Sequence, residues 1–422
     1  MVEKKLSAKY ALLQGVYWML AAIALAYMTP ILEAKGFTSF QIGILNFVKY
    51  VSVIVFQIWI GNFSDRHAKT ISLKLIIGVL VMLCVITSYV FWVVKISMVG
   101  AVIIMLLLGA TVNCVSPLID SLSIQYMNHG RKMNYTISRA TGSFTYATFC
   151  IFLGVFADRC GVTNLLILQV AMALLLLVVN LWMDKVDWSY VQENEEAAKT
   201  ESNDESAFLD DESVHKLDYL FVHFPKYVMF LIGCMLIFMG FNLNCTFMID
   251  WVMELGGSHK DYGMAEFVLS FSEIPFALLF YQIVKHIKID KMMVLCGLFC
   301  TLRAAATTFA PNITVLILSQ ALEICGLAIF YAGSVYFVME NLPKGDVVKG
   351  VSLINVFALG VGEAISSLLS GYIRTNLGIY PLMVVSVFVS ALSVIAMLVM
   401  IRTPKYKKGH NCEMKQGGRI YV

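Results

Sequence analysis

The sequence predicts an all-α membrane protein, with twelve transmembrane helices arranged as two pseudo-symmetric six-helix bundles. Three observations carry this prediction: an apolar composition, twelve apolar runs of membrane-spanning length, and one long acidic segment between the sixth and seventh runs. Of the 422 residues, 59% are hydrophobic and 14% are charged, with a mean hydropathy of +0.77, whereas soluble proteins carry about 25% charge. This composition excludes a soluble enzyme and a largely disordered chain, and the net charge of +3 does not suit a nucleic-acid-binding protein.

Each apolar run is long enough for a helix to cross a hydrocarbon core of about 30 Å, which takes about 20 residues. The first run follows a short basic N-terminus and has no small-residue cleavage site, so we expect a retained helix and not a signal peptide. The runs span roughly residues 10–32, 41–64, 71–94, 97–124, 134–157, 163–183, 227–250, 261–284, 292–310, 313–338, 347–373 and 379–401.

Lysine and arginine are distributed asymmetrically between the two sides of the predicted membrane domain. With the N-terminus placed in the cytoplasm, most of the 31 basic residues fall in cytoplasmic segments or at cytoplasmic helix ends. External loops then hold only Lys35, Lys95, Arg159, Lys260 and Arg374. The positive-inside rule therefore predicts that both termini are cytoplasmic, in a multi-pass protein of the cytoplasmic membrane, inner or plasma.

The segment 184–226 separates the two groups of six runs. From Asp184 to Lys216 it contains eleven acidic and three basic residues and few aliphatic ones, which is typical of a flexible linker. We expect an N-terminal bundle at 1–183, an acidic cytoplasmic linker at 184–226, a C-terminal bundle at 227–401 and a basic cytoplasmic tail at 402–422. A regulatory role for the linker stays open beside that of a solvated tether.

Eight ionisable residues fall within the predicted transmembrane helices or near their ends, where charges are costly and tend to be functional. They are Lys49, Asp120, Arg139, Glu266, Glu273, Arg303, Glu323 and Glu363. A rise of 1.5 Å per residue places Asp120 and Arg139 at a common depth in the first bundle. It likewise places Glu273, Arg303 and Glu323 at a common depth in the second. Both groups predict polar sites near the membrane midplane, although ion pairs that only fix helix packing are the alternative.

Metal binding and catalysis are not expected. Cys296 and Cys300 have ligand spacing on a helix, but no His or acidic residue close in sequence completes a metal site. No Gly-x-Ser-x-Gly or His-Glu-x-x-His pattern occurs. No histidine lies within a predicted membrane helix, so a proton relay must use carboxylates. A membrane-embedded enzyme is therefore the least favoured function class, and no cofactor is expected.

The loop after the second helix reads Gly61-Asn-Phe-Ser-Asp65-Arg66-His-Ala-Lys69. With the two six-helix halves, it resembles the cytoplasmic signature of the major facilitator superfamily, except that Ala68 replaces the usual glycine. The resemblance implies a cytoplasmic gate at Gly61, Asp65, Arg66 and Lys69. In that family the aspartate helps to lock the outward-facing state.

Two further segments resemble the oligosaccharide:proton symporters, the lactose permease-like group, and nucleoside:proton symporters show related patterns. Pro117-Leu-Ile-Asp120 and Arg139-Ala-Thr-Gly142-Ser-Phe-Thr-Tyr146 are similar to that group's sugar-binding acid, arginine and aromatic residue. The resemblance implies that Asp120 and Arg139 bind substrate hydroxyls and that Tyr146 stacks on the ring.

In the second half, Glu273 and Arg303 match the group's acid on the eighth helix and its arginine on the ninth. Glu323 stands where the family has histidine, and Gly326 where some members have an acid. The resemblance therefore implies an altered proton-coupling site in which Glu273 or Glu323 carries the proton beside Arg303. Lys49 and Glu363 are further candidate cavity charges with no assigned role.

These observations predict a secondary transporter that couples a small polyhydroxylated solute, such as a sugar, glycoside or nucleoside, to protons by alternating access. The proton gradient is the driving force, and one chain suffices for a pathway, so a monomer is expected. An uncoupled facilitator or an exporter of small organic compounds is the alternative within transporters. The solute itself is not predicted.

Overall fold

The computed structural model describes residues 2–67, 70–128, 131, 133, 135–184 and 217–404. The described residues are mostly helical and contain no strand. The first half contains α1 Val2–Leu25, α2 Met28–Ala34, α3 Ser39–Arg66, α4 Leu73–Val93, α5 Met98–Leu108, α6 Cys114–Asn128, α7 Tyr135–Cys160 and α8 Leu165–Trp182. The second half contains α10 Leu217–His223, α11 Pro225–Cys245, α12 Met248–Glu254, α13 His259–Val284, α14 Ile289–Thr308, α15 Ile313–Ser319, α16 Leu327–Asn341, α17 Val347–Asn355, α18 Glu363–Asn376 and α19 Ile379–Arg402.

Ten stretches of helix among the described residues are long and apolar enough to cross a membrane. They coincide with ten of the twelve predicted runs. The other two runs, 261–284 and 292–310, form α13 and α14, helices of 26 and 20 residues whose polar residues make them less apolar. The predicted all-helical membrane architecture is confirmed at this level.

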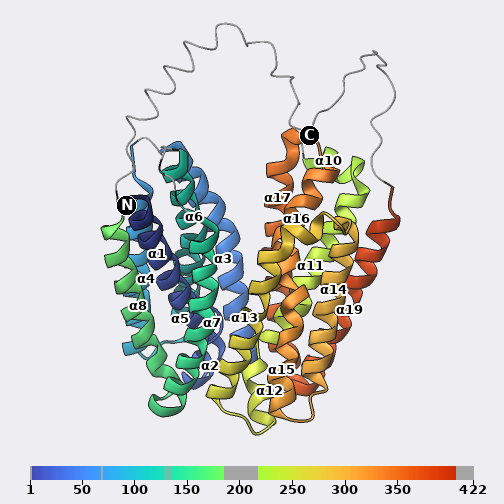
Figure 1. Ribbon diagram of the computed structural model, residues 1–422. Coiled ribbons are helices and arrows are strands. Elements are labelled where there is room, and N and C mark those ends of the chain that lie inside the picture. Colours follow the sequence, from blue (N-terminus) through green and yellow to red (C-terminus); the bar gives the residue numbers. More distant parts are fainter. Residues whose placement is uncertain are drawn as a thin grey trace, which may run out of the picture.

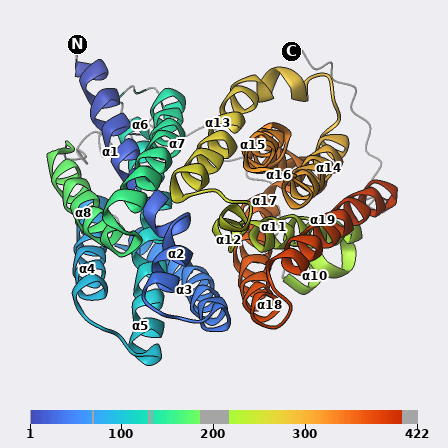
Figure 2. The same ribbon diagram turned by 90° about the horizontal axis from the view of Figure 1, so that it is seen from below.

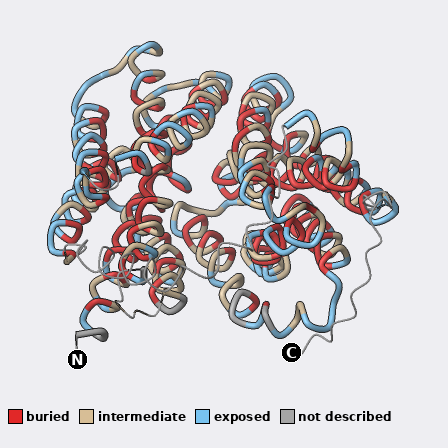
Figure 3. Tube along the Cα trace, turned by 90° about the horizontal axis from the view of Figure 1, so that it is seen from above, coloured by how far each residue is buried: buried red, intermediate tan, exposed pale blue. Residues whose placement is uncertain are grey.

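The two halves form two clusters of helices side by side (Figure 1, Figure 2). Buried residues line the inner faces of the helices, and exposed ones face outward, as the view in Figure 3 shows. Helix α1 begins and helix α19 ends at the same end of the molecule, which we call the terminal end. The other end, where α2 and α12 lie, is called the opposite end.

The two halves are packed together at the opposite end. One buried apolar cluster continues from the first half into residues of the second half there, including Phe247, Trp251 and Tyr262, whereas Phe230 and Phe337 belong to a separate cluster confined to the second half. The contacts join α7 to α13 and α3 to α18. This arrangement closes the opposite end.

Glycines permit the closest approach between the halves. A Cβ atom on Gly43 of α3 would lie 2.9 Å from the Cα atom of Gly371 in α18. A Cβ atom on Gly263 of α13 would lie 2.3 Å from the carbonyl oxygen of Cys150 in α7. Any side chain at these positions would force the helices apart, because such contacts are shorter than van der Waals distances.

Several transmembrane helices are not regular along their length. Two π-helical turns, Gly109–Asn113 and Val356–Gly362, interrupt the runs α5–α6 and α17–α18. A 3₁₀ turn at Gln320–Cys325 separates α15 from α16. Such irregular turns inside helices are frequent at functional sites, and two of the three adjoin or contain a predicted charged residue.

Most of the predicted linker and tail lies outside the described residues. The described part of the linker includes Asp184 and helix α10, and the described part of the tail ends at residue 404.

Candidate functional site

The second half contains a buried ion pair. Arg303 Nε of α14 lies 2.7 Å from Glu323 Oε2, and the two side chains are 1% and 0% exposed. The Arg303 guanidinium also donates to Gln320 Oε1 at 2.9 Å and lies over the Phe241 ring, 4.7 Å from its centroid. The charges therefore neutralise each other inside a dry, tightly packed environment.

The break between α15 and α16 positions Glu323. Its Oε1 atom accepts a hydrogen bond of 2.8 Å from the backbone N–H of Leu327, the first residue of α16. A carboxylate suits the start of a helix because the first N–H groups have no partner within the helix. A Cβ atom on Gly326 would lie only 2.2 Å from Oε1. Gly326 thus makes space for the carboxylate of Glu323.

Gln320 extends this cluster to polar side chains of the neighbouring helix. Its amide nitrogen donates to Thr307 Oγ1 at 2.9 Å and to Ser319 Oγ at 3.1 Å, while its oxygen accepts from Arg303. Buried polar networks stabilise a unique arrangement when their members are paired. The sequence placed Arg303 and Glu323 at one depth, and the structure brings them into contact.

Glu273 of α13 is placed differently. It is half-buried, and among the described residues it has no hydrogen bond and no ion pair. Its carboxylate nevertheless interacts electrostatically with Arg139 of the first half and with Arg303 and Glu323 of the second. Glu273 therefore lies between the polar groups of the two halves.

The first half does not pair Asp120 directly with Arg139; no ion pair joins them among the described residues. Asp120 Oδ1 instead accepts from Gln14 Nε2 at 2.9 Å and from the Tyr10 hydroxyl at 3.4 Å. The Arg139 guanidinium lies 4.6 Å from the centre of the Trp18 ring. The physical reason is that α1, which packs along α7, supplies partners to both side chains.

Trp18 connects Arg139 to Tyr146. A Cβ atom on Gly142 would lie 2.3 Å from Trp18 Cδ1, so this glycine lets the indole ring rest against α7. Tyr146 meets Trp18 edge to face, with ring centroids 6.0 Å apart. The Tyr146 hydroxyl then donates to Glu266 Oε2 of α13 at 3.5 Å. Arg139 and Tyr146 thus share one face, as the sequence predicts.

The sequence alone gave no role to Tyr10, Gln14, Trp18 or Glu266. A signal was available for α1, because Tyr10, Gln14 and Trp18 recur every four residues and so lie on one helix face. Glu266 gave no such signal for its contact with the first half, because Tyr146 is far away in the chain.

Lys49 and Glu363 lie on α3 and α18, which pack against each other. Lys49 is 4% exposed, and its ammonium group lies 4.7 Å from the centre of the Tyr50 ring. Glu363 follows the π-helical turn Val356–Gly362 directly. No ion pair joins the two among the described residues, although each is within electrostatic range of the other.

The predicted gate residues Gly61, Asp65 and Arg66 form the last turns of α3 at the terminal end, where Arg66 is exposed. Lys69 lies outside the described residues. Within the described part of the chain, no group of three or more His, Cys, Asp or Glu residues is placed to hold a metal ion.

Outside the membrane-spanning helices, two carboxyl groups have shifted pKa values. At the terminal end, a hydrogen bond from Lys9 at 2.7 Å keeps the pKa of Asp184 below its ordinary value. At the opposite end, burial and the nearby Asp250 carboxylate raise the pKa of Glu33 to about 8. Asp250 is itself paired with Arg374, Nε to Oδ2 at 2.6 Å.

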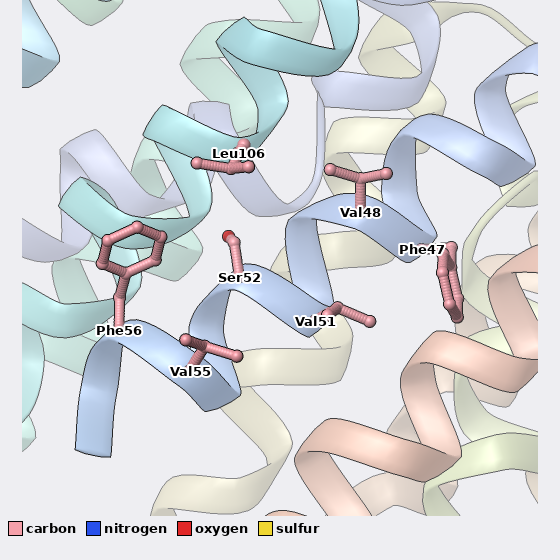
Figure 4. A pocket seen from close by; sticks show the side chains of 7 residues that line it. All are labelled: Phe47, Val48, Val51, Ser52, Val55, Phe56 and Leu106. Carbon is pink, nitrogen blue, oxygen red and sulfur yellow. The ribbon is translucent and has the colours of Figure 1, made fainter. Parts of the chain in front are cut away.

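A groove of about 200 Å³ lies away from these charges, between α3 and α5 (Figure 4). It is lined by Phe47, Val48, Val51, Ser52, Val55, Phe56 and Leu106. Because no charged side chain lines it, this groove does not belong to the candidate site.

Comparison with known proteins identifies similar sequences and folds. Residues 10–380 match the model of the MFS_1 like family. No curated protein matches the chain. The nucleoside transporter NupG, as a mutant with one aspartate replaced by alanine, has a similar fold, with a TM-score of 0.78 and 15% identity over 94% of this chain and 99% of that one.

Two other transporters are similar to the chain at lower TM-scores. One is a bacterial homologue of the human lysosomal transporter Spinster in an inward-facing conformation, with a TM-score of 0.68 and 11% identity over 95% of this chain and 97% of that one. The other is a peptide transporter POT, as a mutant with one glutamate replaced by glutamine and in complex with alafosfalin, with a TM-score of 0.65 and 11% identity over 96% of both chains. At these identities the likeness establishes the fold alone.

Proposed function

The chain belongs to the MFS_1 like family and is a multi-pass membrane transporter, not an enzyme, and we propose that it is a proton-coupled symporter of a small polyhydroxylated solute. Sugars, glycosides and nucleosides are the candidate substrates. The nucleoside transporter NupG, which has a similar fold, supports nucleosides within this class. Transport would proceed by alternating access, as the two halves rock around a midplane site.

The observation that carries this proposal is the position of Glu273. It has no direct partner among the described residues, yet it is within electrostatic range of Arg139 in the first half and Arg303 in the second. A carboxylate between two arginines can hold or release a proton as the neighbouring charges are engaged. Glu273 therefore lies between the half that is proposed to bind the solute and the Arg303–Glu323 pair of the other half.

Each half would have its own task. Asp120 and Arg139 would hydrogen-bond to solute hydroxyls, and Tyr146 would stack on the solute ring. Glu273 or Glu323 would carry the proton beside Arg303. Solute bound at Arg139 would draw this guanidinium away from Glu273, which would favour proton uptake there. Deprotonation on the other side of the membrane would then favour solute release.

The orientation is part of the same proposal. Twelve transmembrane helices, with α13 and α14 included, would place both termini in the cytoplasm of the cytoplasmic membrane. The opposite end would then face outward and is closed by the contacts between the halves, so this structure would represent an inward-facing state. Gly61, Asp65, Arg66 and Lys69 would form the cytoplasmic gate of a monomer.

The proposal is tested with purified protein in proteoliposomes. A thermal-shift screen of sugars, nucleosides and phenolic acids first identifies a solute. We expect an imposed inward proton gradient to drive its accumulation, and uptake to fall as the external pH rises. Because Glu273 or Glu323 carries the proton, at least one of the variants Glu273→Gln and Glu323→Gln should abolish accumulation against a gradient. Persistence of driven accumulation in both variants would overturn the mechanism.

An uncoupled facilitator is the second candidate. It is favoured by the Arg303–Glu323 pair, because an ion pair buried this deeply can serve packing alone. Counterflow of solute without any movement of protons would support the facilitator. Accumulation that requires the proton gradient would exclude it.

A further inference from the structure

Glu266 is a buried carboxyl group that the proposed mechanism does not use. It lies on α13 at the contact with α7 and is 6% exposed. Its Oε2 atom accepts a hydrogen bond from the Tyr146 hydroxyl of the first half, and Tyr262, whose hydroxyl donates to the Ala26 carbonyl oxygen at 2.8 Å, is a further neighbour on its own helix. Glu266 therefore forms part of the contact that closes the opposite end.

The groups that face Glu266 are almost all uncharged. They are Tyr27, Tyr146 and Cys150 of the first half and Cys245, Tyr262 and Arg303 of the second. Arg303 is the only cation in this set, and it is held by Glu323 at 2.7 Å and Gln320 at 2.9 Å. Within the described part of the chain, no cation lies within ion-pair distance of Glu266.

The closed state therefore favours a proton on Glu266. Burying an ionised carboxylate without a cation is far more costly than burying a neutral carboxylic acid, which tyrosine hydroxyls can satisfy by hydrogen bonding. When α7 and α13 separate, the Tyr146 contact is lost and water reaches the carboxyl group, so the ionised form becomes acceptable. The two arrangements of the halves thus differ in how well they tolerate the charge.

We propose that Glu266 makes closure of the opposite end proton-linked: it takes up a proton from the solution on that side when the halves close and returns it to the same solution when they open. This goes beyond the proposed symport, although it rests on the alternating access proposed with it. The proton at Glu266 stays on one side of the membrane, so it alters the conformational equilibrium without adding to the protons carried with the solute.

Two other contacts between the halves contain ionisable side chains and must be silenced in the test. Glu33 borders Asp250 and Arg374, and His259 Nδ1 lies 2.9 Å from Asp158 Oδ1. The reference protein therefore carries Glu33→Gln and His259→Asn, which keep polar side chains at both contacts, and Glu273→Gln, which removes the carboxyl group at the centre of the proposed symport. Glu266→Gln is added to this background, since glutamine keeps an acceptor for the Tyr146 hydroxyl but cannot ionise.

The measurement is a distance between the halves as a function of pH. Spin labels are attached to Cys160 of the first half, which is the exposed member of the described cysteines, and to Asn376→Cys of the second half, with Cys412→Ser to remove the thiol of the tail. Both labelled positions lie at the opposite end. Double electron–electron resonance of purified protein in nanodiscs, without solute, then gives the ratio of the closed to the open distance between pH 5 and 9.

We expect the closed-to-open ratio of the reference protein to fall as the pH rises, by up to about tenfold per pH unit where one proton is linked. In the Glu266→Gln variant the ratio should stay at its low-pH value throughout. Glu254→Gln, which removes an exposed carboxyl group at the end of α12, should retain the pH dependence of the reference.

The proposal is overturned if the reference ratio is independent of pH, if Glu266→Gln retains the pH dependence, or if Glu254→Gln removes it. Failure of the symport proposal is a separate result, because that proposal is judged by proton-driven accumulation and not by this distance. The proton-to-solute stoichiometry should be unchanged in Glu266→Gln. A lower stoichiometry in this variant would mean that Glu266 carries a transported proton, and it would contradict the proposal.

Discussion

The two halves treat their charged residues in opposite ways. In the second half, Arg303 and Glu323 are paired at 2.7 Å, fully buried and supported by Gln320. In the first half, Asp120 and Arg139 are half-buried and have no cation–carboxylate contact with each other; their neighbours are an amide, hydroxyls and an indole ring. Arg303 and Glu323 neutralise each other within the second half, whereas Asp120 and Arg139 keep hydrogen-bonding capacity for the proposed solute.

This difference separates residues that stabilise the fold from residues that are proposed to bind the solute. A buried ion pair contributes little net stability as a pair, but removal of one partner leaves a buried charge uncompensated. Partly exposed charges can be removed at small cost. Equivalent substitutions in the two halves should therefore affect different measurements.

The largest effect is expected for Arg303→Met. It should lower the free energy of unfolding by about 3–5 kcal/mol, because Glu323 would be left buried without its cation. Chemical unfolding of the purified protein in detergent micelles, followed by tryptophan fluorescence and circular dichroism, measures the change. The double variant Arg303→Met/Glu323→Leu is the control and should recover most of the loss, since it removes both charges. Equal destabilisation of the single and double variants would contradict this account.

Gly142→Ala is expected to have the next largest effect, of about 1–3 kcal/mol on the free energy of unfolding. The added methyl group would lie 2.3 Å from Trp18 Cδ1, so the ring must move away from α7. Because Arg139 rests on that ring, solute binding should weaken as well. Unfolding and thermal-shift titrations measure both effects.

The matched control for Gly142→Ala is Gly61→Ala in α3, where a Cβ atom meets nothing within 4 Å. This substitution should leave the free energy of unfolding within about 0.5 kcal/mol of the wild-type value, because no neighbour must move. Similar losses in both glycine variants would show that the close contact with Trp18 is not the cause.

Arg139→Met is the direct counterpart of Arg303→Met and should be much milder for stability. We expect a loss of about 1 kcal/mol or less, from the contact with Trp18, because no buried carboxylate depends on this guanidinium. Solute affinity should fall by about 10-fold or more, as expected for a lost charged hydrogen bond. Isothermal titration calorimetry measures the solute affinity, and chemical unfolding measures the stability. A stability loss as large as that of Arg303→Met would erase the proposed difference between the halves.

The sequence predicted the architecture well because membrane spans and positive charges leave strong signals along the chain. The helix boundaries follow the apolar runs, and depth counting placed Arg303 near Glu323. Counting residues along the helices placed Asp120 and Arg139 at a shared depth but did not predict their partners, because depth does not fix how each helix is rotated about its axis. In the structure, Gln14 of α1 contacts Asp120 and Trp18 of α1 contacts Arg139. The contact of Tyr146 with Glu266 could not be predicted from the sequence either, because it forms only where the two halves pack together.

The break in the tenth run was also beyond sequence reasoning. Gly326 in place of the acid that some family members carry suggested only an altered proton site. The structure gives a physical reason for the glycine: the Glu323 carboxylate occupies the space that a side chain at 326 would need. A glycine within an apolar run has many possible causes, and only the fold shows which group approaches it.

The smallest effect is expected at the opposite end. There the first half supplies Glu33, which has no ion pair among the described residues, and the second half supplies the Asp250–Arg374 ion pair. Burial, followed by the Asp250 carboxylate, raises the pKa of Glu33 to about 8, so the packed state favours protonated Glu33. The contribution of this contact is therefore complete below the ordinary glutamate pKa of about 4.5 and is lost as the pH rises through about 8. The melting temperature of the wild-type protein should fall, relative to that of Glu33→Gln, by a small amount between pH 5 and 9. A difference in melting temperature that does not change with pH would mean that Glu33 is not protonated in the packed state, and that the Asp250–Arg374 pair accommodates its charge.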